Sequence, residues 1–293
     1  MNLTYFITGV TGYLGSEIIH QLEKMGGNFY CLKRRTSNTY RVNDIESKIN
    51  WLNLEDFEVE SFFEKNHIDC IIHCATNYGR KVVDPFQTIE ANLTLPLKLL
   101  HYGSIAGVNS FINTDTVLDK NIDTYSLSKK QFLDWLERYS KRIVAINVAL
   151  QHFYGPGDDP TKFATNIIRS LMSSIPRLKL TKGEQHRDFI YIHDVVNAFI
   201  KIIEASATMS RGYHEFEAGT GKAVKLKDFV NLVKVLVMNT DTILDFGALP
   251  YRPGEVMYIE SNSAALINLG WAPNFTLEQG LSLTITQERL RVE

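Results

Sequence analysis

The stretch that decides the fold is Tyr5-Phe-Ile-Thr-Gly-Val-Thr-Gly-Tyr-Leu-Gly15, close to the start of the chain. Apolar residues typical of a strand lead into three glycines, and a segment with apolar residues at helical spacing, 16–24, follows them. Glycines in such a turn allow a tight bend, close approach of the backbone to a pyrophosphate, and close packing of the helix on the strand. The helix N-terminus adds partial positive charge for the phosphates. The stretch therefore predicts a dinucleotide site, whose contacts in the turn are Gly9, Thr11, Gly12, Tyr13, Leu14 and Gly15.

The rest of the first half repeats this alternation of strand and helix. Five further segments are short, apolar and strand-like: 29–32, 49–52, 69–75, 110–113 and 142–148. Strands alternating with helical stretches predict a parallel sheet with helices on both faces. After residues 154–158 the segments become short and mixed. We therefore expect a Rossmann-type, doubly wound α/β domain at residues 1–160 and a smaller α+β substrate-binding cap at residues 161–293, with part of 189–205 returning to the first domain.

The end of the second predicted strand indicates which dinucleotide is bound. An NAD site carries an acidic residue about twenty residues after the glycines, where it binds the ribose 2′-hydroxyl. This chain has Lys33-Arg34-Arg35 there and no carboxylate nearby. The run is either a solvated charged surface or a clamp for the extra phosphate of NADP, and its position favours the clamp. Arg34 is the leading candidate because a guanidinium suits bidentate phosphate contact.

A candidate catalytic pair lies at Tyr125-Ser-Leu-Ser-Lys129, which places a phenol and an ammonium on one face of a predicted helix. The pair follows a strand end rich in hydroxyl and polar groups, Asn113-Thr-Asp-Thr116. Hydride addition to a ketone builds negative charge on the oxygen, which requires a proton donor and a second hydrogen bond. A phenol has a pKa near 10, and a neighbouring ammonium can lower it. Tyr125 is therefore the expected proton donor and Lys129 its partner.

Composition excludes several other kinds of protein. Lys and Arg number 31 against 33 Asp and Glu, so the chain lacks the basic excess of a nucleic-acid-binding protein. The apolar runs are too short for a membrane span, and the start shows no signal peptide, so we expect a cytoplasmic protein. The three cysteines are too few for a disulfide framework. Cys70 and Cys74 lie about 13 Å apart on a strand, with His73 facing the other way from Cys74, so we expect no metal site.

The motifs together resemble the extended short-chain dehydrogenase/reductase family, which acts on nucleotide sugars. They are the glycine turn, the Tyr-Lys pair, Tyr154-Gly-Pro-Gly157, Arg252-Pro-Gly-Glu255 and Leu269-Gly-Trp-Ala-Pro273. Four segments resemble in particular the members that reduce the 4-keto group of a CDP-linked 3,6-dideoxyhexose in O-antigen biosynthesis: Asn77–Gly79, Phe111–Asp115, Gly183–Phe189 and Asp245–Ala248.

The resemblance implies roles for individual residues. Thr114 takes the place of the hydroxyl residue that binds the substrate carbonyl. Thr116 is the alternative, although the following Val117 fits the family pattern best with Thr114 in that role. Arg187 and Arg252 match arginines that hold the nucleotide diphosphate, or else make surface salt bridges. Asn77, Tyr78 and His152 are further substrate candidates, and His152 is equally compatible with a packed structural role. The remaining implied cofactor contacts are Asn53, Leu54 and Ala75.

Three functions remain open at this level. The first is an NADPH-dependent reductase of a nucleotide-linked 4-ketosugar, and the second is a nucleotide-sugar epimerase that keeps NAD bound. The third is a non-enzymatic redox sensor on the same fold, which the presence of Tyr125 and Lys129 disfavours. A sugar dehydratase would need an acidic base where this chain has Thr116. The resemblance also implies a homodimer formed through two helices that flank the sheet.

Overall fold

The structure is a computed structural model that describes residues 3–79 and 84–292. Its contacts divide the chain into two compact units. The first unit comprises residues 1–149 and 196–216, and the second comprises residues 150–195 and 217–293. Each unit is discontinuous in sequence, because the chain leaves the first, builds part of the second, and returns before completing it.

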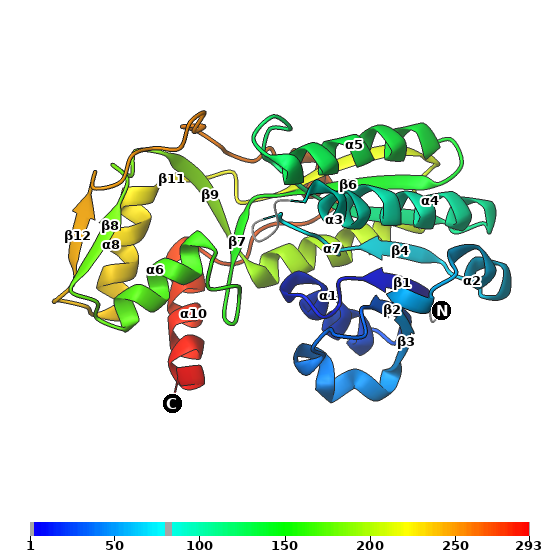
Figure 1. The fold of residues 1–293 in the computed structure, drawn as a ribbon, viewed down its shortest axis with the longest axis horizontal. Helices are drawn as coiled ribbons and strands as arrows, with labels where there is room; N and C mark the ends of the chain where they lie inside the picture. The colour runs from blue at the N-terminus through cyan, green and yellow to red at the C-terminus, as the bar shows by residue number, and fades with distance from the viewer. Residues whose placement is uncertain (1–2, 80–83, 293) are drawn as a thin grey trace. The chain divides into compact units, whose positions relative to one another are not determined.

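The first unit is built on a seven-stranded sheet in the order β10-β6-β5-β4-β1-β2-β3 (Figure 1). The strands are β1 Thr4–Thr8, β2 Asn28–Lys33, β3 Ile49–Asn53, β4 Cys70–His73, β5 Ser110–Thr116, β6 Val144–Leu150 and β10 Gly212–Ala218. The pairs β1–β2, β1–β4, β2–β3 and β4–β5 are parallel. The predicted Rossmann-type doubly wound sheet is therefore confirmed.

Helices cover both faces of this sheet, as successive residues of β5 show. Phe111 packs on Phe132 of α5, with ring centroids 5.7 Å apart, whereas the neighbouring Ser110 contacts Ser206 of α7. Because adjacent side chains of a strand point to opposite faces, α5 and α7 lie on opposite sides of the sheet (Figure 1). The helical segments are α1 Tyr13–Lys24, η1 Tyr40–Lys48, η2 Leu54–Asp56, α2 Val59–Lys65, α3 Pro85–Ile89, η3 Glu90–Thr94, α4 Leu95–Ile105, α5 Thr124–Tyr139 and α7 Ile192–Ser206.

The core on the α5 face of the sheet is strongly aromatic. Phe6 of β1 contacts the rings of Phe62 and Phe63 of α2, and the cluster continues through Phe111 and Phe132. The order of the strands changes direction between β1 and β4, where the loops that follow these two strands diverge to opposite sides. In open α/β sheets this switch point is where ligands bind. The fold thus predicts a site at the carboxyl ends of β1, β4 and β5.

The second unit contains two small sheets, ordered β11-β9-β7 and β12-β8. Phe189 of β9 stacks on Phe229 of α8 with ring centroids 4.1 Å apart and forms the centre of its core. The elements are β7 His152–Tyr154, α6 Phe163–Met172, β8 Arg177–Leu180, β9 His186–Tyr191, β11 Ala223–Lys225, α8 Leu226–Val237, β12 Ile243–Phe246, α9 Ala264–Asn268 and α10 Leu277–Val292. This mixture of short strands and helices is the α+β cap expected from the sequence.

Two strands of the sheet differ from the sequence-based expectation. β5 was expected at residues 110–113 but continues to Thr116, because buried polar groups pair its last residues. Asn113 donates to Asn147 at 2.9 Å, and Asp115 accepts from Lys130 at 2.6 Å. The strand expected at residues 69–75 is shorter, since β4 ends at His73. No helix in residues 3–79 or 84–292 has both the length and the apolar character needed to cross a membrane.

Candidate active site

The glycine turn between β1 and α1 requires glycine at two positions. Gly9 has a φ of +76°, and a Cβ atom there would lie 2.5 Å from the amide nitrogen of Ala75. A Cβ atom on Gly15 would lie 2.3 Å from the carbonyl oxygen of Gly9. The turn is closed by a hydrogen bond from Gly12 N to Gly9 O at 2.9 Å. Only glycine allows the chain to fold this tightly here.

The N-terminus of α1 is available to bind an anion. Its N-cap residue is Gly12, no side chain caps the helix, and its first turn holds no acidic residue. The first amide groups of a helix have no partner within the helix, and they carry partial positive charge. Because Leu14 and Gly15 lie in the first turn of the helix, their amide groups are candidate donors to a pyrophosphate. The turn therefore fits a dinucleotide, with Ala75 directly beside it and Thr11 within it.

The three basic residues at the end of β2 have different surroundings. Arg35 is bound by the carboxylate of Asp56 at 2.7 Å, and its backbone amide donates to Glu55. The Lys33 ammonium lies 5.5 Å from the centroid of the Trp51 ring. The exposed Arg34 guanidinium makes no hydrogen bond or ion pair with any residue that the structure describes. Of the three residues, Arg34 is thus the one whose charge is not paired with any side chain that the structure describes.

A further arginine near the glycine turn was not found from the sequence. The Arg41 guanidinium lies 5.3 Å from the ring centroid of Tyr13 and 5.0 Å from that of Tyr40. Tyr13 belongs to the glycine turn, so Arg41 places a second cation beside the phosphate-binding segment. The signal in the sequence was weak, since Arg41 lies seven residues beyond Arg34 in a stretch with no clear periodicity.

Two of the remaining predicted cofactor contacts, Asn53 and Leu54, lie at the same edge of the sheet as the basic run. Asn53 ends β3 and pairs in register with Lys33 of β2, while the side chain of Leu54, which follows, is exposed. Ala75 lies nearer the turn, since its amide donates to the hydroxyl of Thr8 at 3.2 Å. Asn53 and Leu54 are therefore two strands away from the glycine turn, close to the basic residues of β2.

The candidate catalytic pair is held on α5, next to the end of β5. Asp123 and Ser126 form a reciprocal capping box that fixes where α5 begins. Lys129, four residues after Tyr125, is almost completely buried, and its ammonium donates to Thr114 O at 2.8 Å. Burial lowers the pKa of Lys129 to about 8, partly offset by the negative charge of Asp115. The ammonium is therefore charged at neutral pH in a position beside β5.

The Tyr125 phenol meets a second phenol and a hydroxyl. Its ring centroid lies 5.0 Å from that of Tyr78, and it shares a hydrogen bond with the Thr116 hydroxyl. Burial raises the pKa of Tyr125 well above 10, as do Tyr78 and Asp115, whereas the bond to Thr116 lowers it. Tyr125 is consequently protonated at neutral pH, which is the state required of a proton donor.

Both threonines at the end of β5 lie close to this pair. The Thr114 hydroxyl donates to His73 O at 3.0 Å, so its hydrogen must turn away from that carbonyl before it can serve a ligand. The Thr116 hydroxyl accepts from Leu118 N at 3.2 Å and contacts Tyr125. The structure brings both candidate hydroxyls to the site, and the one in contact with Tyr125 is Thr116.

Asn77 shapes the loop after β4. Its side-chain oxygen accepts from Gly79 N, and its backbone amide donates to the buried Asn92 side chain, each at 2.9 Å. Asn92 also donates to Ser128 of α5 at 3.0 Å. These bonds fix the loop that carries Tyr78 relative to the helix that carries Tyr125. Asn77 therefore contributes at least as a loop-forming residue.

The remaining substrate candidates lie in the second unit. Arg187 is largely buried and forms an ion pair with Glu255, whereas the side chain of Arg252 is exposed. Burial and the neighbouring Arg187 charge lower the pKa of His152 to about 4, so this imidazole is neutral. Its Nδ1 atom has no hydrogen-bond partner among residues 3–79 and 84–292. Orphaned buried nitrogen atoms of this kind are uncommon and point to a ligand or a solvent molecule as partner.

The pKa of Lys129 predicts how activity depends on pH. The ammonium is present below about pH 8 and is lost above it, so we expect kcat/KM to fall as pH rises through that region. A pH profile of the free enzyme measures this directly. In a Lys129→Arg variant the cation cannot lose its proton, so the fall that belongs to residue 129 should disappear. An unchanged fall near pH 8 in that variant would assign it to another group.

Comparison with known proteins gives one consistent family. Residues 5–219 match the model of the NAD dependent epimerase/dehydratase family. A CDP-abequose synthase of Salmonella typhimurium is 32% identical over 286 residues, which cover 94% of this chain and 95% of that protein. The family resemblance indicated by the sequence motifs is therefore confirmed.

Solved structures confirm the fold. A UDP-glucose 4-epimerase of Thermotoga maritima, solved with UDP-glucose, has a TM-score of 0.86 at 21% identity and covers 99% of this chain and 100% of its own. A UDP-glucose 4-epimerase of Thermus thermophilus, solved with NAD, has a TM-score of 0.81 at 20% identity. The match covers 98% of this chain and 99% of that protein's chain.

Proposed function

Because the chain belongs to the NAD-dependent epimerase/dehydratase family of nucleotide-sugar modifying enzymes, we propose that it reduces the 4-keto group of a nucleotide-linked deoxysugar with NADPH. The substrate is CDP-4-keto-3,6-dideoxyhexose or a related 4-keto-6-deoxy sugar, and the product serves O-antigen or other surface polysaccharide synthesis in the cytoplasm. The observation that carries the proposal is the convergence of Tyr125, Lys129 and the threonine hydroxyls at the end of β5.

The proposed reaction assigns a role to each of these groups. Bound NADPH would supply the hydride that adds to C4 of the sugar. Tyr125 donates its proton to the ketone oxygen as negative charge develops there, and a positioned acid of this kind accelerates such a step by about 10²- to 10⁴-fold. Lys129 stabilises the phenolate that remains, since its ammonium is held beside the site. Thr114 is the proposed second donor to the oxygen, and Thr116 orients the phenol.

The proposed cofactor is NADP(H) rather than NAD(H). The glycine turn and the N-terminus of α1 would hold the pyrophosphate, and Lys129 has two further N–H donors beyond its bond to Thr114 O for the nicotinamide ribose. Arg34 would bind the 2′-phosphate, with Lys33 and Arg35 beside it. The free guanidinium of Arg34 supports this assignment. Exchangeable NADPH suits a net reduction, in which the cofactor leaves oxidised after each turnover.

The two neighbouring arginines allow a matched test of this cofactor. We expect Arg34→Ala to raise the KM for NADPH by about 10- to 100-fold, the loss of one charge-assisted bidentate contact, while the KM for NADH stays the same. Arg35→Ala should change the KM for NADPH by less than about threefold, because Arg35 is already paired with Asp56. Steady-state kinetics with both cofactors measure the ratio of the KM for NADPH to the KM for NADH in each variant. Equal effects of the two substitutions would exclude Arg34 as a specific phosphate ligand.

The proposed substrate contacts in the second unit are cationic. Arg187 and Arg252 would bind the two phosphates of the nucleotide sugar, and His152 would offer its orphaned Nδ1 atom to the sugar. Arg187 is held by Glu255 in the structure, so its guanidinium must share that carboxylate with the diphosphate or exchange it. Arg252, by contrast, forms no ion pair with any residue that the structure describes, so its guanidinium need not exchange a partner.

The alternative function is a nucleotide-sugar epimerase that retains NAD. The structural likeness to solved UDP-glucose 4-epimerases is the reason to consider this function. The same residues, Tyr125 and Lys129, would serve an epimerase. The cofactor separates the two functions, because an epimerase regenerates its NAD within each turnover. Absorbance and mass analysis of the purified protein would reveal tightly held NAD. Tightly bound NAD together with no consumption of NADPH would refute the reductase.

The direct test of the proposed function is an NADPH-oxidation assay with four substrate classes. The CDP-, dTDP-, GDP- and UDP-linked 4-keto-6-deoxy sugars are supplied in turn, and NMR gives the configuration at C4 of each product. We expect one class, the CDP-linked sugars, to support the highest kcat/KM. Oxidation of NADPH with none of the four classes would contradict the proposal.

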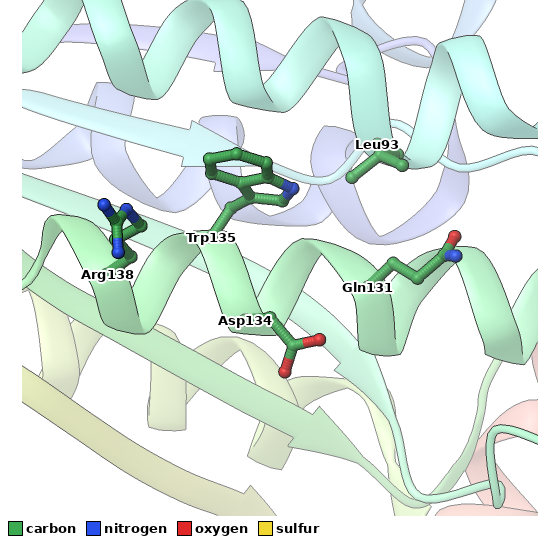
Figure 2. A pocket seen from close by; sticks show the side chains of 5 residues that line it. All are labelled: Leu93, Gln131, Asp134, Trp135 and Arg138. Atoms are coloured by element: carbon green, nitrogen blue, oxygen red, sulfur yellow. The ribbon is translucent and has the colours of Figure 1, made fainter.

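We also propose that the chain forms a homodimer through α4 and α5. Apolar side chains are exposed on these two helices: Ile105 is 64% exposed, Leu127 43% and Trp135 41%. Figure 2 shows the five side chains that line a pocket on this face: Leu93 of η3 and Gln131, Asp134, Trp135 and Arg138 of α5. Trp and Arg are enriched at protein interfaces, so this face has side chains suited to one.

A single substitution tests this interface. We expect Trp135→Glu to convert the dimer to a monomer, because it replaces a partly exposed indole with a charged side chain, and multi-angle light scattering would measure the mass. Met25→Glu is the control, since Met25 is 47% exposed at the end of α1 and far along the sheet from α5. A dimer that survives Trp135→Glu would exclude this face as the interface.

A further inference from the structure

Two consecutive lysines of α5 bind the end of β5. Lys129 donates to Thr114 O at 2.8 Å, and Lys130 donates to Thr116 O at 2.9 Å. Lys130 also donates to the carboxylate of Asp115 at 2.6 Å. The two ammonium groups therefore contact three successive residues of the strand. The helix that carries Tyr125 is tied to the strand that carries both candidate hydroxyls.

The contact between Lys130 and Asp115 is buried on the side of the carboxylate. The Asp115 side chain has no exposed surface, whereas that of Lys130 is 26% exposed. Asp115 also accepts from Asn147 at 3.3 Å, and Asn147 in turn bonds Asn113 and Glu215. A buried carboxylate whose cation is removed is costly, so this pair is far more constrained than an exposed ion pair.

The roles of the two lysines are chemically distinct. Lys129 lies at the reacting groups, where its ammonium has donors left for a ligand. The hydrogen bonds of Lys130 go to the backbone and to the carboxylate of β5. Lys130 is not among the residues proposed to bind the cofactor or the substrate. An anchor that takes no part in the chemistry keeps the distance between α5 and β5 constant while Lys129 changes partners. A displacement of about 1 Å at reacting groups can cost about 100-fold in rate.

On this basis we propose that Lys130, through its buried ion pair with Asp115, is a positioning residue that fixes Tyr125 against Thr116 and Thr114. The proposal rests on the proposed reductase function for its kinetic readout. Its structural basis is independent of that function, because the hydrogen bonds between α5 and β5 exist whatever the substrate is.

The charges around Lys129 provide a second readout. The titratable groups coupled to it are Asp115 of β5, His73 at the end of β4, Cys74 directly after that strand, and Lys130 of α5. Asp115 raises the pKa of Lys129, and Lys130 lowers it. Loss of Asp115 alone should therefore move the fall of activity near pH 8 to lower pH. A role limited to folding would leave that pH unchanged.

The test compares variants by kinetics with NADPH and the best 4-ketosugar. We expect Lys130→Met to lower kcat by about 10- to 100-fold with less than about threefold change in either KM, and Lys130→Arg to recover most of the loss. The double variant Asp115→Asn with Lys130→Met removes both charges of this ion pair, so it tests the proposal even if the single variant, with its buried unpaired carboxylate, fails to fold. Its kcat should remain low, because the contact between residue 130 and β5 is still absent.

The control is Lys201→Met, which removes an exposed ion pair with Glu204 on α7 and should leave kcat unchanged. Hydrogen exchange of the amides of residues 124–130, which needs no substrate, should be faster in the double variant than in the wild type. A double variant with wild-type kcat and wild-type exchange would overturn the proposal. Suppose instead that exchange is faster in that variant but the wild-type enzyme reduces no 4-ketosugar. The reductase function would then be refuted, whereas the anchoring of α5 to β5 by Lys130 would still be supported.

Discussion

Replacement of Tyr125 by phenylalanine is expected to lower kcat by about 1000-fold while the fold and the affinity for NADPH are retained. The substitution removes only the phenolic oxygen, and with it the proton donor to the developing alkoxide. Water would then have to supply the proton in a site where Tyr125 is shielded by Tyr78. Single-turnover measurements of NADPH oxidation, with cofactor binding followed separately by fluorescence, distinguish loss of chemistry from loss of binding.

The same helix offers a matched control. Tyr139 is the last residue of α5, and its hydroxyl bonds the ring of His101 at 2.8 Å. Tyr139→Phe also removes one phenolic oxygen, but it does so far along the helix from Lys129. We expect it to reduce stability by about 1 kcal/mol, the net value of one hydrogen bond, and to leave kcat unchanged. Equal kcat values for Tyr125→Phe and the wild type would show that the mechanism is wrong.

Substitution of alanine for Gly15 is expected to weaken NADPH binding by at least about 100-fold. The new Cβ atom would lie 2.3 Å from Gly9 O, so the glycine turn and the start of α1 would have to separate. Separation moves the amide groups at the helix N-terminus out of line with the pyrophosphate, which loses several charge-assisted contacts at once. Isothermal titration with NADPH measures the loss.

Gly212→Ala serves as the control for this prediction. Gly212 begins β10 in the same unit, and a Cβ atom there would meet its nearest neighbour at 3.5 Å, an ordinary contact. We expect no change in NADPH affinity for this variant and no loss of thermal stability. If Gly15→Ala bound NADPH as tightly as Gly212→Ala, the pyrophosphate would have to lie elsewhere.

The features that the sequence predicted well are local ones. The glycine turn is specified by residues within one short segment, and its steric demand does not depend on distant parts of the chain. The helical spacing of Tyr125 and Lys129 likewise places them on one face without further information. For the same reason the alternation of strand and helix was sufficient to predict the doubly wound sheet.

The features that the sequence did not reveal depend on partners far along the chain. Arg35 looked equivalent to Arg34 until the structure placed Asp56, 21 residues later, against it. The strand was expected only at residues 110–113, and the bond from Asn147, 32 residues away, explains why Asp115 can be buried in its continuation. Lys130 gave no signal, since a lysine on a helix is usually solvated.

The family pattern and the structure single out different threonines at the end of β5. The family pattern favours Thr114 as the donor to the substrate oxygen, whereas the hydroxyl in contact with Tyr125 is that of Thr116. Both side chains point to the same side of the strand because they are two residues apart. Comparing Thr114→Val with Thr116→Val would separate the two roles, since loss of a substrate contact and loss of phenol orientation act on different steps.

The central claim, net reduction of a 4-ketosugar by NADPH, is tested most directly by following the transferred hydrogen. NADPH carrying deuterium at both hydrogen positions of C4 of its nicotinamide ring is incubated with CDP-4-keto-3,6-dideoxyhexose, and the product is examined by NMR. We predict one deuterium at C4 of the sugar for each NADPH oxidised. A product without deuterium at C4, formed while the NADPH remains unconsumed, would contradict the reductase and indicate chemistry on a retained cofactor.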